Sequence, residues 1–214
     1  MKQFLKNLRS PIAITMLLAS LAINVKAQTS KFGISFNSLT TNFNYGKSNS
    51  QMQPCKKNYT GLQVGVSYQA GISSAFSIVP ELYFATKGGT LLSNNPITGG
   101  KSTLRLNTLD LPVLARVHFN QFYINAGPYV AYTLVGKLKT EVSQATSENK
   151  VSVPFGENGL KRWDYGLQAG AGYNFNLKKS ILSLDVRYGY GLANITGDVE
   201  RYNRMLNISL TISK

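Results

Sequence analysis

The clearest pattern in this chain is a strict alternation of apolar and polar residues close to its C-terminus. Between residues 206 and 213, aliphatic side chains occupy the even positions and small polar side chains occupy the odd positions. Successive side chains of a β-strand point to opposite faces of a sheet, so this period of two predicts a strand with one apolar and one polar face. The same alternation recurs over 60–70, 163–175 and 180–192. The chain is therefore predicted to consist largely of two-faced strands.

Four further segments alternate less cleanly and bring the prediction to eight strands. The predicted strands are 31–38, 60–70, 75–87, 102–118, 121–137, 163–175, 180–192 and a C-terminal strand that ends at residue 213. Helical spacing of apolar residues is not sustained anywhere after the first 27 residues. We therefore expect an all-β protein, an eight-stranded antiparallel up-and-down transmembrane β-barrel.

The connections between these strands alternate in length. The predicted short turns are 71–74, 119–120 and 176–179, and the predicted long loops are 39–59, 88–101, 138–162 and 193–202. Both termini then lie on the side of the short turns. This arrangement is typical of bacterial outer-membrane barrels, in which short turns face the periplasm and long loops face outward.

The first 27 residues have the pattern of a cleaved signal peptide. Three basic residues precede an apolar run over 12–25, and compact residues up to Ala27 suit cleavage after that position. The run has about 14 residues, fewer than the roughly 20 that a spanning helix needs, which favours a signal peptide over an uncleaved anchor. We predict a signal peptide at 1–27 and one barrel domain at 28–214.

The chain is strongly basic. Its formal net charge is +14, and cleavage would lower it to +10, because the leader carries four basic residues and no acidic ones. The remaining basic residues are scattered over turns and loops. This distribution favours anionic lipid head groups or polyanionic surface glycans as partners, and we expect no binding of nucleic acid.

The assignment of the two strand faces separates a membrane barrel from a soluble one. Eight strands enclose an interior just wide enough to be filled by side chains, and here the polar face is also the compact one. Aromatic residues such as Tyr68, Tyr165 and Tyr188 lie near strand ends or on the apolar face, as interfacial girdles do. The pattern favours the cell outer membrane, with its lipid as a partner. A soluble periplasmic lipocalin-like ligand carrier is the alternative.

Charged residues also fall on the predicted polar face. They are Glu81, Arg116, Asp164, Asp185 and Arg187. Glu81 and Arg116 should lie on adjacent strands, as should Asp164 and the Asp185/Arg187 pair, so opposite charges are placed to satisfy one another. An unpaired buried charge is costly, which favours a structural plug in the lumen. A proton or ion path, or the active site of a lipid-modifying barrel enzyme, is the functional alternative.

Other candidate chemistry is sparse. His118 is the only histidine and Cys55 the only cysteine, so the sequence identifies no catalytic pair, disulfide or transition-metal site. The glycines over 166–172 alternate on one face, and we interpret them as room for lumen side chains rather than as a phosphate loop. We expect no enzymatic activity, no cofactor and no metal.

Several strings, taken in order, resemble the PorT-like outer-membrane β-barrel family. The strings are FGISFNS, TGLQVGVSY, VPELYFATKGG, LDLPVLARV, FYINAGPYVAYTLVGK, WDYGLQAGAGYNF and LDVRYGYGLANI. The resemblance extends over about residues 31–212 and implies an outer-membrane barrel. The member that gave the family its name is linked to protein secretion and surface display, and the resemblance extends this link to the present chain as an expectation. The chain departs from the usual outer-membrane ending, because it closes on Ile212-Ser213-Lys214 instead of an aromatic residue.

The leading functional expectation is a non-enzymatic scaffold or binding protein of the outer membrane. Its loops 39–59 and 138–162 would contact an envelope or secretion partner, since binding residues concentrate on loops held by a rigid scaffold. A lipid-modifying or proteolytic barrel enzyme would need His, Ser and Asp gathered near one rim. A small pore is a third alternative, for which eight strands leave little room.

Overall fold

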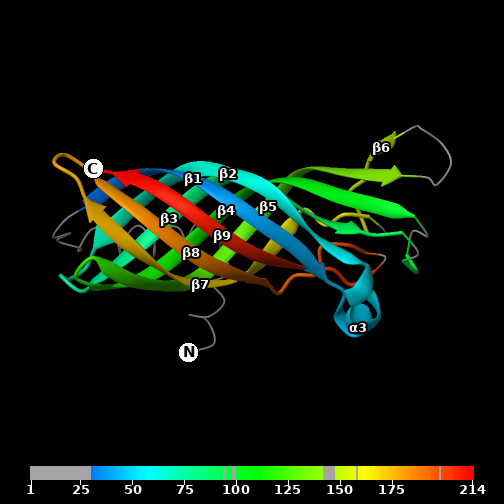
Figure 1. Cartoon of the computed structure of the whole chain (residues 1–214), viewed down its shortest axis with the longest axis horizontal. Coiled ribbons are helices and arrows are strands. Elements are labelled where there is room, and N and C mark those ends of the chain that lie inside the picture. The colour runs from blue at the N-terminus through cyan, green and yellow to red at the C-terminus, as the bar shows by residue number, and fades with distance from the viewer. Residues whose placement is uncertain (1–29, 94, 98–99, 142–147, 158, 198) are drawn as a thin grey trace, which may run out of the picture.

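The protein folds as a closed antiparallel β-barrel (Figure 1). The computed structural model describes residues 30–93, 95–97, 100–141, 148–157, 159–197 and 199–214, so the predicted signal peptide lies outside the described residues. The strands in these ranges are β1 (Ser30–Asn44), β2 (Lys56–Gly71), β3 (Phe76–Leu91), β4 (Lys101–Phe119), β5 (Phe122–Glu141), β6 (Glu148–Ser152), β7 (Trp163–Asn176), β8 (Ile181–Gly191) and β9 (Tyr202–Ser213).

Eight of these strands form the barrel, in the order β4-β3-β2-β1-β9-β8-β7-β5, and pairing of β4 with β5 closes it. The short strand β6 pairs with the far end of β5, outside this ring. The predicted eight-stranded antiparallel barrel is therefore confirmed. No helix in the described part of the chain is both long and apolar enough to cross a membrane.

The short turns lie at one end of the barrel. They join β2 to β3, β4 to β5 and β7 to β8, and both ends of the described chain lie beside them. In the turn at 120–121, Asn120 has a φ of 59°, a left-handed conformation that asparagine tolerates and that tight hairpins require. We call the end of the barrel that carries these turns the short-turn end. The opposite end, which carries α3 and β6 in Figure 1, is the long-loop end.

The outward face of the barrel is apolar over most of its height. In β9, Leu206, Ile208 and Leu210 are exposed, whereas Asn207 and Ser209 point inward and are buried. Neighbouring strands present the same exposed aliphatic and aromatic side chains. A continuous apolar wall around a polar interior is the arrangement of a barrel in lipid, so the predicted assignment of the two faces is confirmed.

Several strands, β1, β2, β3 and β5 among them, are longer than predicted at the long-loop end. In β4 the outward residues near that end are polar, such as Lys101 and Arg105, and the inward residues Leu104 and Leu106 are apolar. The pattern thus inverts where the barrel wall extends beyond the lipid-facing belt and meets water. The predicted loop 39–59 was therefore too long: β1 continues to Asn44 and β2 begins at Lys56, which reduces the connection to 45–55.

The long connections at this end pack against the barrel mouth. The connection from β1 to β2 folds into η1 (Gly46–Ser48), α3 (Asn49–Met52) and η2 (Gln53–Cys55). The buried cluster beneath the connections comprises Phe43, Tyr45, Met52, Leu91, Leu104, Leu106, Leu160 and Ile195. The long-loop end is therefore a packed apolar head above a polar lumen.

Candidate functional site

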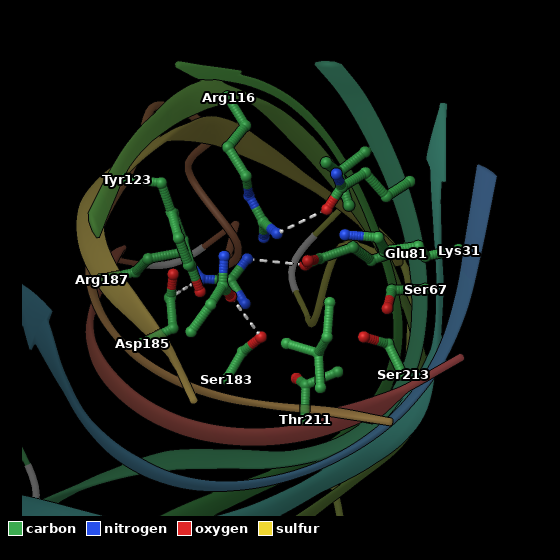
Figure 2. Close-up of a pocket in the computed structure, with 14 residues that line it drawn as sticks. Lys31, Ser67, Glu81, Arg116, Tyr123, Ser183, Asp185, Arg187, Thr211 and Ser213 are labelled. Carbon is green, nitrogen blue, oxygen red and sulfur yellow. Dashed lines mark hydrogen bonds and ion pairs between the residues drawn. The ribbon is translucent and has the colours of Figure 1, made fainter. Parts of the chain in front are cut away.

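A buried ion pair crosses the lumen between opposite walls (Figure 2). The Nη1 atom of Arg187, on β8, lies 2.6 Å from Oε2 of Glu81, on β3, and the two side chains are 2% and 3% exposed. Four steps around the ring separate β3 from β8 in either direction. Arg187 also contacts the carboxylate of Asp185 at 2.6 Å, and Asp185 accepts a hydrogen bond from Asn125. The network therefore links strands β3, β5 and β8 across the lumen.

The predicted pairing of Glu81 with Arg116 is wrong, although their strands are neighbours as expected. Arg116 is opposite Ser77 in the register of β3 and β4, four residues from Glu81 and thus roughly 13 Å away along the strand. Arg116 instead donates a 3.2 Å hydrogen bond to Gln69. Its guanidinium lies 4.1 Å from the centre of the Tyr123 ring.

Asp164 belongs to a different level of the lumen. It accepts hydrogen bonds from Asn203 at 2.8 Å and from the Tyr129 hydroxyl at 3.2 Å. Although β7 and β8 are neighbours, Arg187 is opposite Gly170, six residues from Asp164 and roughly 20 Å along the strand. The five predicted charges therefore do not form a single cluster.

A second buried ion pair was missed at the sequence level. Nζ of Lys87 lies 2.8 Å from Oδ2 of Asp110, with side chains 0% and 1% exposed. Gln63 and Thr108 also donate hydrogen bonds to Asp110. Lys87 was predicted to be the last residue of its strand. In the structure β3 continues to Leu91, so Lys87 is an inward position within the strand and is buried in the lumen. Asp110 lies on a face that also carries apolar residues, which hid its inward position.

Glycines on β7 make room for the large side chains of this network. A Cβ added at Gly172 would collide with the ring of Tyr123, and one at Gly170 would meet the stem of Arg187. Gly172 and Tyr123 are direct partners across β7 and β5. The interpretation of the 166–172 glycines as space for lumen side chains is confirmed.

His118 has a hydrogen-bond partner that the sequence did not reveal. Its Nε2 lies 2.9 Å from Oγ of Ser77 at the short-turn end. The charged groups that act on this imidazole are the cations Arg116 and Lys31, whereas a catalytic dyad is oriented by a carboxylate or amide. Ser77 is only 1% exposed, so its hydroxyl is poorly placed to attack a substrate.

The lumen as a whole is a nearly balanced set of charges. Its buried charged residues are the carboxylates Glu81, Asp110, Asp164 and Asp185 and the cations Lys87, Arg116 and Arg187. This set lacks the ring of one sign that selective ion pathways use. Across the described ranges, no three His, Cys, Asp or Glu side chains gather in a way that would hold a metal ion.

We expect the barrel to pass no steady ionic current. The pocket around the Arg187–Glu81 pair has a free volume of only about 20 Å³, room for about one water molecule. Single-channel recording in a planar bilayer, with a porin as the positive control, should detect no stable openings. Reproducible unitary conductance from pure, folded protein would contradict this prediction.

Comparison with known proteins identifies the family. A model described as the outer membrane protein beta-barrel domain matches residues 24–197. This chain belongs to that family. Membership in the outer membrane protein beta-barrel domain family, together with the apolar outer wall, places the protein in the outer membrane and rejects the soluble lipocalin-like alternative.

Solved structures of outer-membrane proteins resemble this member of the outer membrane protein beta-barrel domain family at low sequence identity. Neisserial surface protein A is 9% identical, with 86% of this chain and 95% of that chain covered and a TM-score of 0.44. OprG from Pseudomonas aeruginosa is 12% identical, with 87% and 96% covered and a TM-score of 0.44. Ail of Yersinia pestis is 15% identical, with 85% and 97% covered and a TM-score of 0.40. Among curated proteins, no sequence matches this chain.

Proposed function

We propose that this protein is a non-enzymatic binding protein of the outer membrane that captures an envelope protein at its long-loop end. The observation that carries the proposal is a strand extension of the barrel wall with one unpaired edge. Outer-membrane lipid would contact the apolar outer wall, and the tied lumen would serve as a rigid support for the binding surface.

The strand extension consists of residues 101–105 of β4, 137–141 of β5 and all of β6. The end of β5 pairs with β4 on one side and with β6 on the other. In the described part of the chain, no strand pairs with the other edge of β6. Such an edge offers backbone N–H and C=O groups to a strand of another protein. Val151 on β6 is 61% exposed, which provides an apolar contact beside that edge.

The predicted partner loop 138–162 contains most of this extension. The connection over 45–55 lies at the same end of the barrel (Figure 1), and we assign it to the same contact surface. Its buried Met52 anchors it to the head, so we expect it to support the partner rather than to rearrange.

The test is to shorten the hairpin of β5 and β6 while keeping the barrel. Replacing residues 140–149 with Asn-Gly would join Lys139 to Lys150, which are paired across β5 and β6, through a two-residue hairpin turn. A photo-crosslinking residue at position 151 in whole cells should yield a discrete protein adduct in the full chain. The shortened variant should lose at least nine-tenths of that adduct.

The matched control replaces Lys178-Lys179 with the same Asn-Gly pair, in the turn at the opposite end of the barrel. Both variants should fractionate with the outer membrane and keep heat-modifiable gel migration. An adduct that persists in the shortened variant, or disappears equally in the control, would overturn the proposal.

The PorT-like resemblance motivates a finer proposal, that the captured partner belongs to a secretion or surface-display system. Mass spectrometry of the adduct tests it directly. Recovery of a secretion component supports this role, and recovery of a protein outside secretion rejects it while leaving partner capture intact.

A further inference from the structure

The apolar head at the long-loop end contains a partly open cavity of about 250 Å³. Inward residues at the ends of four barrel strands form much of its wall, namely Phe43, Leu91, Leu104 and Leu138. Val153 and Leu160, from the connection between β5 and β7, line it as well. The cavity is separate from the ion pairs of the lumen, because its lining includes none of the residues that form them.

An apolar hollow is unexpected at the water-facing mouth of a polar lumen. Lower in the barrel, the inward positions of β1 carry Ser35 and Asn37, but at the long-loop end two of the three, Leu39 and Phe43, are apolar. Lipid does not require this change, since these side chains point away from the membrane. Protein interiors are close-packed, and an apolar cavity of about 150 Å³ is sufficient to bind benzene. By the same proportion, this cavity has room for roughly ten non-hydrogen atoms.

One side of the cavity carries a cation with an unused hydrogen-bond donor. Arg201 lies in the connection between β8 and β9, and its Nε is buried without a hydrogen-bond partner among the described residues. Its guanidinium lies 5.9 Å from the centre of the Tyr45 ring. No carboxylate in the described part of the chain forms an ion pair with it.

The position of Arg201 is fixed by its backbone. Its N–H donates to the side chain of Asn194 at 2.9 Å, and its carbonyl accepts from the N–H of Ile195 at 2.9 Å. Burial raises the pKa of Tyr45, and Arg201 opposes part of that rise. Tyr45 is therefore a neutral phenol at neutral pH and does not cancel the charge of Arg201. The cavity thus has mainly apolar walls and one positive charge that has no carboxylate partner among the described residues.

We infer that this cavity binds a small amphipathic anion, with an apolar body enclosed by the leucine and phenylalanine side chains and a carboxylate that accepts a hydrogen bond from Arg201. An apolar pocket with one oriented polar group is the usual form of a small-molecule site. An oxygen anion is the partner that a guanidinium prefers. Leu104 and Leu138 of the strand extension line this site, but no residue of β6 does, so binding here does not depend on the free edge proposed to capture a protein.

The test uses 3-phenylpropanoate as the probe, with 3-phenylpropan-1-ol as its uncharged counterpart. Binding is measured by isothermal titration to the full chain in nanodiscs, with empty nanodiscs subtracted. Saturable binding of the carboxylate at a site stoichiometry of one is expected. The alcohol should bind at least tenfold more weakly.

Variants separate the charge from the cavity. Arg201→Gln keeps the backbone contacts and should weaken binding of the carboxylate at least tenfold while leaving binding of the alcohol unchanged. Lys178→Gln is the control for loss of a positive charge, because Lys178 is exposed in the turn at the opposite end of the barrel, and it should bind as the parent does. Leu138→Trp fills the cavity and should abolish binding of both probes. Val153→Phe provides a second filling variant if the first fails to fold.

Absence of saturable binding to the parent protein would overturn the inference. Equal binding of the carboxylate by the parent and by Arg201→Gln would also overturn it, as would binding that survives in a folded cavity-filling variant. The variant with residues 140–149 replaced should bind the probe normally, so failure of the protein-capture proposal is distinguishable from failure of this one.

Discussion

Arg187→Met should lower the free energy of unfolding by about 3–5 kcal/mol, the range found when one partner of a buried ion pair is removed. The substitution leaves Glu81 and Asp185 in the lumen without their shared cation. Methionine approximates the length of the arginine stem, so the lost charge dominates the effect. Urea unfolding from lipid vesicles, followed by the heat-dependent gel shift, measures the change.

A triple variant serves as the control for Arg187→Met. Glu81→Gln and Asp185→Asn, combined with Arg187→Met, remove all three charges and should recover most of the lost stability. A loss below about 1 kcal/mol in the single variant, the value typical of an exposed pair, would contradict the structural role predicted for these charges. Full stability together with a lost cellular activity would favour the functional alternative.

Gly172→Val should lower the free energy of unfolding by about 3 kcal/mol, at the upper end of the usual cost of overpacking. The new Cβ would collide with the Tyr123 ring, which is buried and covered by the Arg116 guanidinium. The pocket beside the ring has a free volume of only about 20 Å³, which is too small for the ring to turn into. The same urea titration measures the effect.

A second-site change tests whether this collision is the cause. Tyr123→Ala removes the ring, so the double variant with Gly172→Val should be less destabilised than the sum of the two single variants. Ala171→Val is the matched control, because residue 171 points to the outer wall and a larger aliphatic side chain suits lipid. Strict additivity, or an equal loss in Ala171→Val, would contradict the steric explanation.

The alternation of residues was sufficient to predict the strands in the lipid-facing belt. There, one face meets hydrocarbon and the other a narrow polar lumen, so each position has a single suitable polarity. At the long-loop end the outer face meets water and the inner face packs against the connections. Lys101 and Leu104 therefore have the opposite polarity pattern, and the sequence alone predicted loops where β1, β3 and β5 continue as strands.

The partners of the lumen charges were predictable only in part. Sequence placed Glu81 and Arg187 inward, because both follow the period of their strands. Their contact depends on closure of the sheet, which brings β3 opposite β8 across the lumen. Neighbouring strands, by contrast, are offset in register, so Arg116 and Glu81 on adjacent strands do not pair. Prediction of the Lys87–Asp110 pair would also have required the knowledge that β3 continues past Lys87 to Leu91.

The sequence by itself determined the class of fold, the face that meets lipid and most of the charged residues that point into the lumen, because period-two alternation links each of these directly to local chain geometry. Only the tertiary structure decided which charges pair and where the strands end. It also decided that the connections help to line a partly open, mainly apolar cavity beside Arg201. These features depend on residues far apart in the chain, whose distances are set by the closure and register of the barrel.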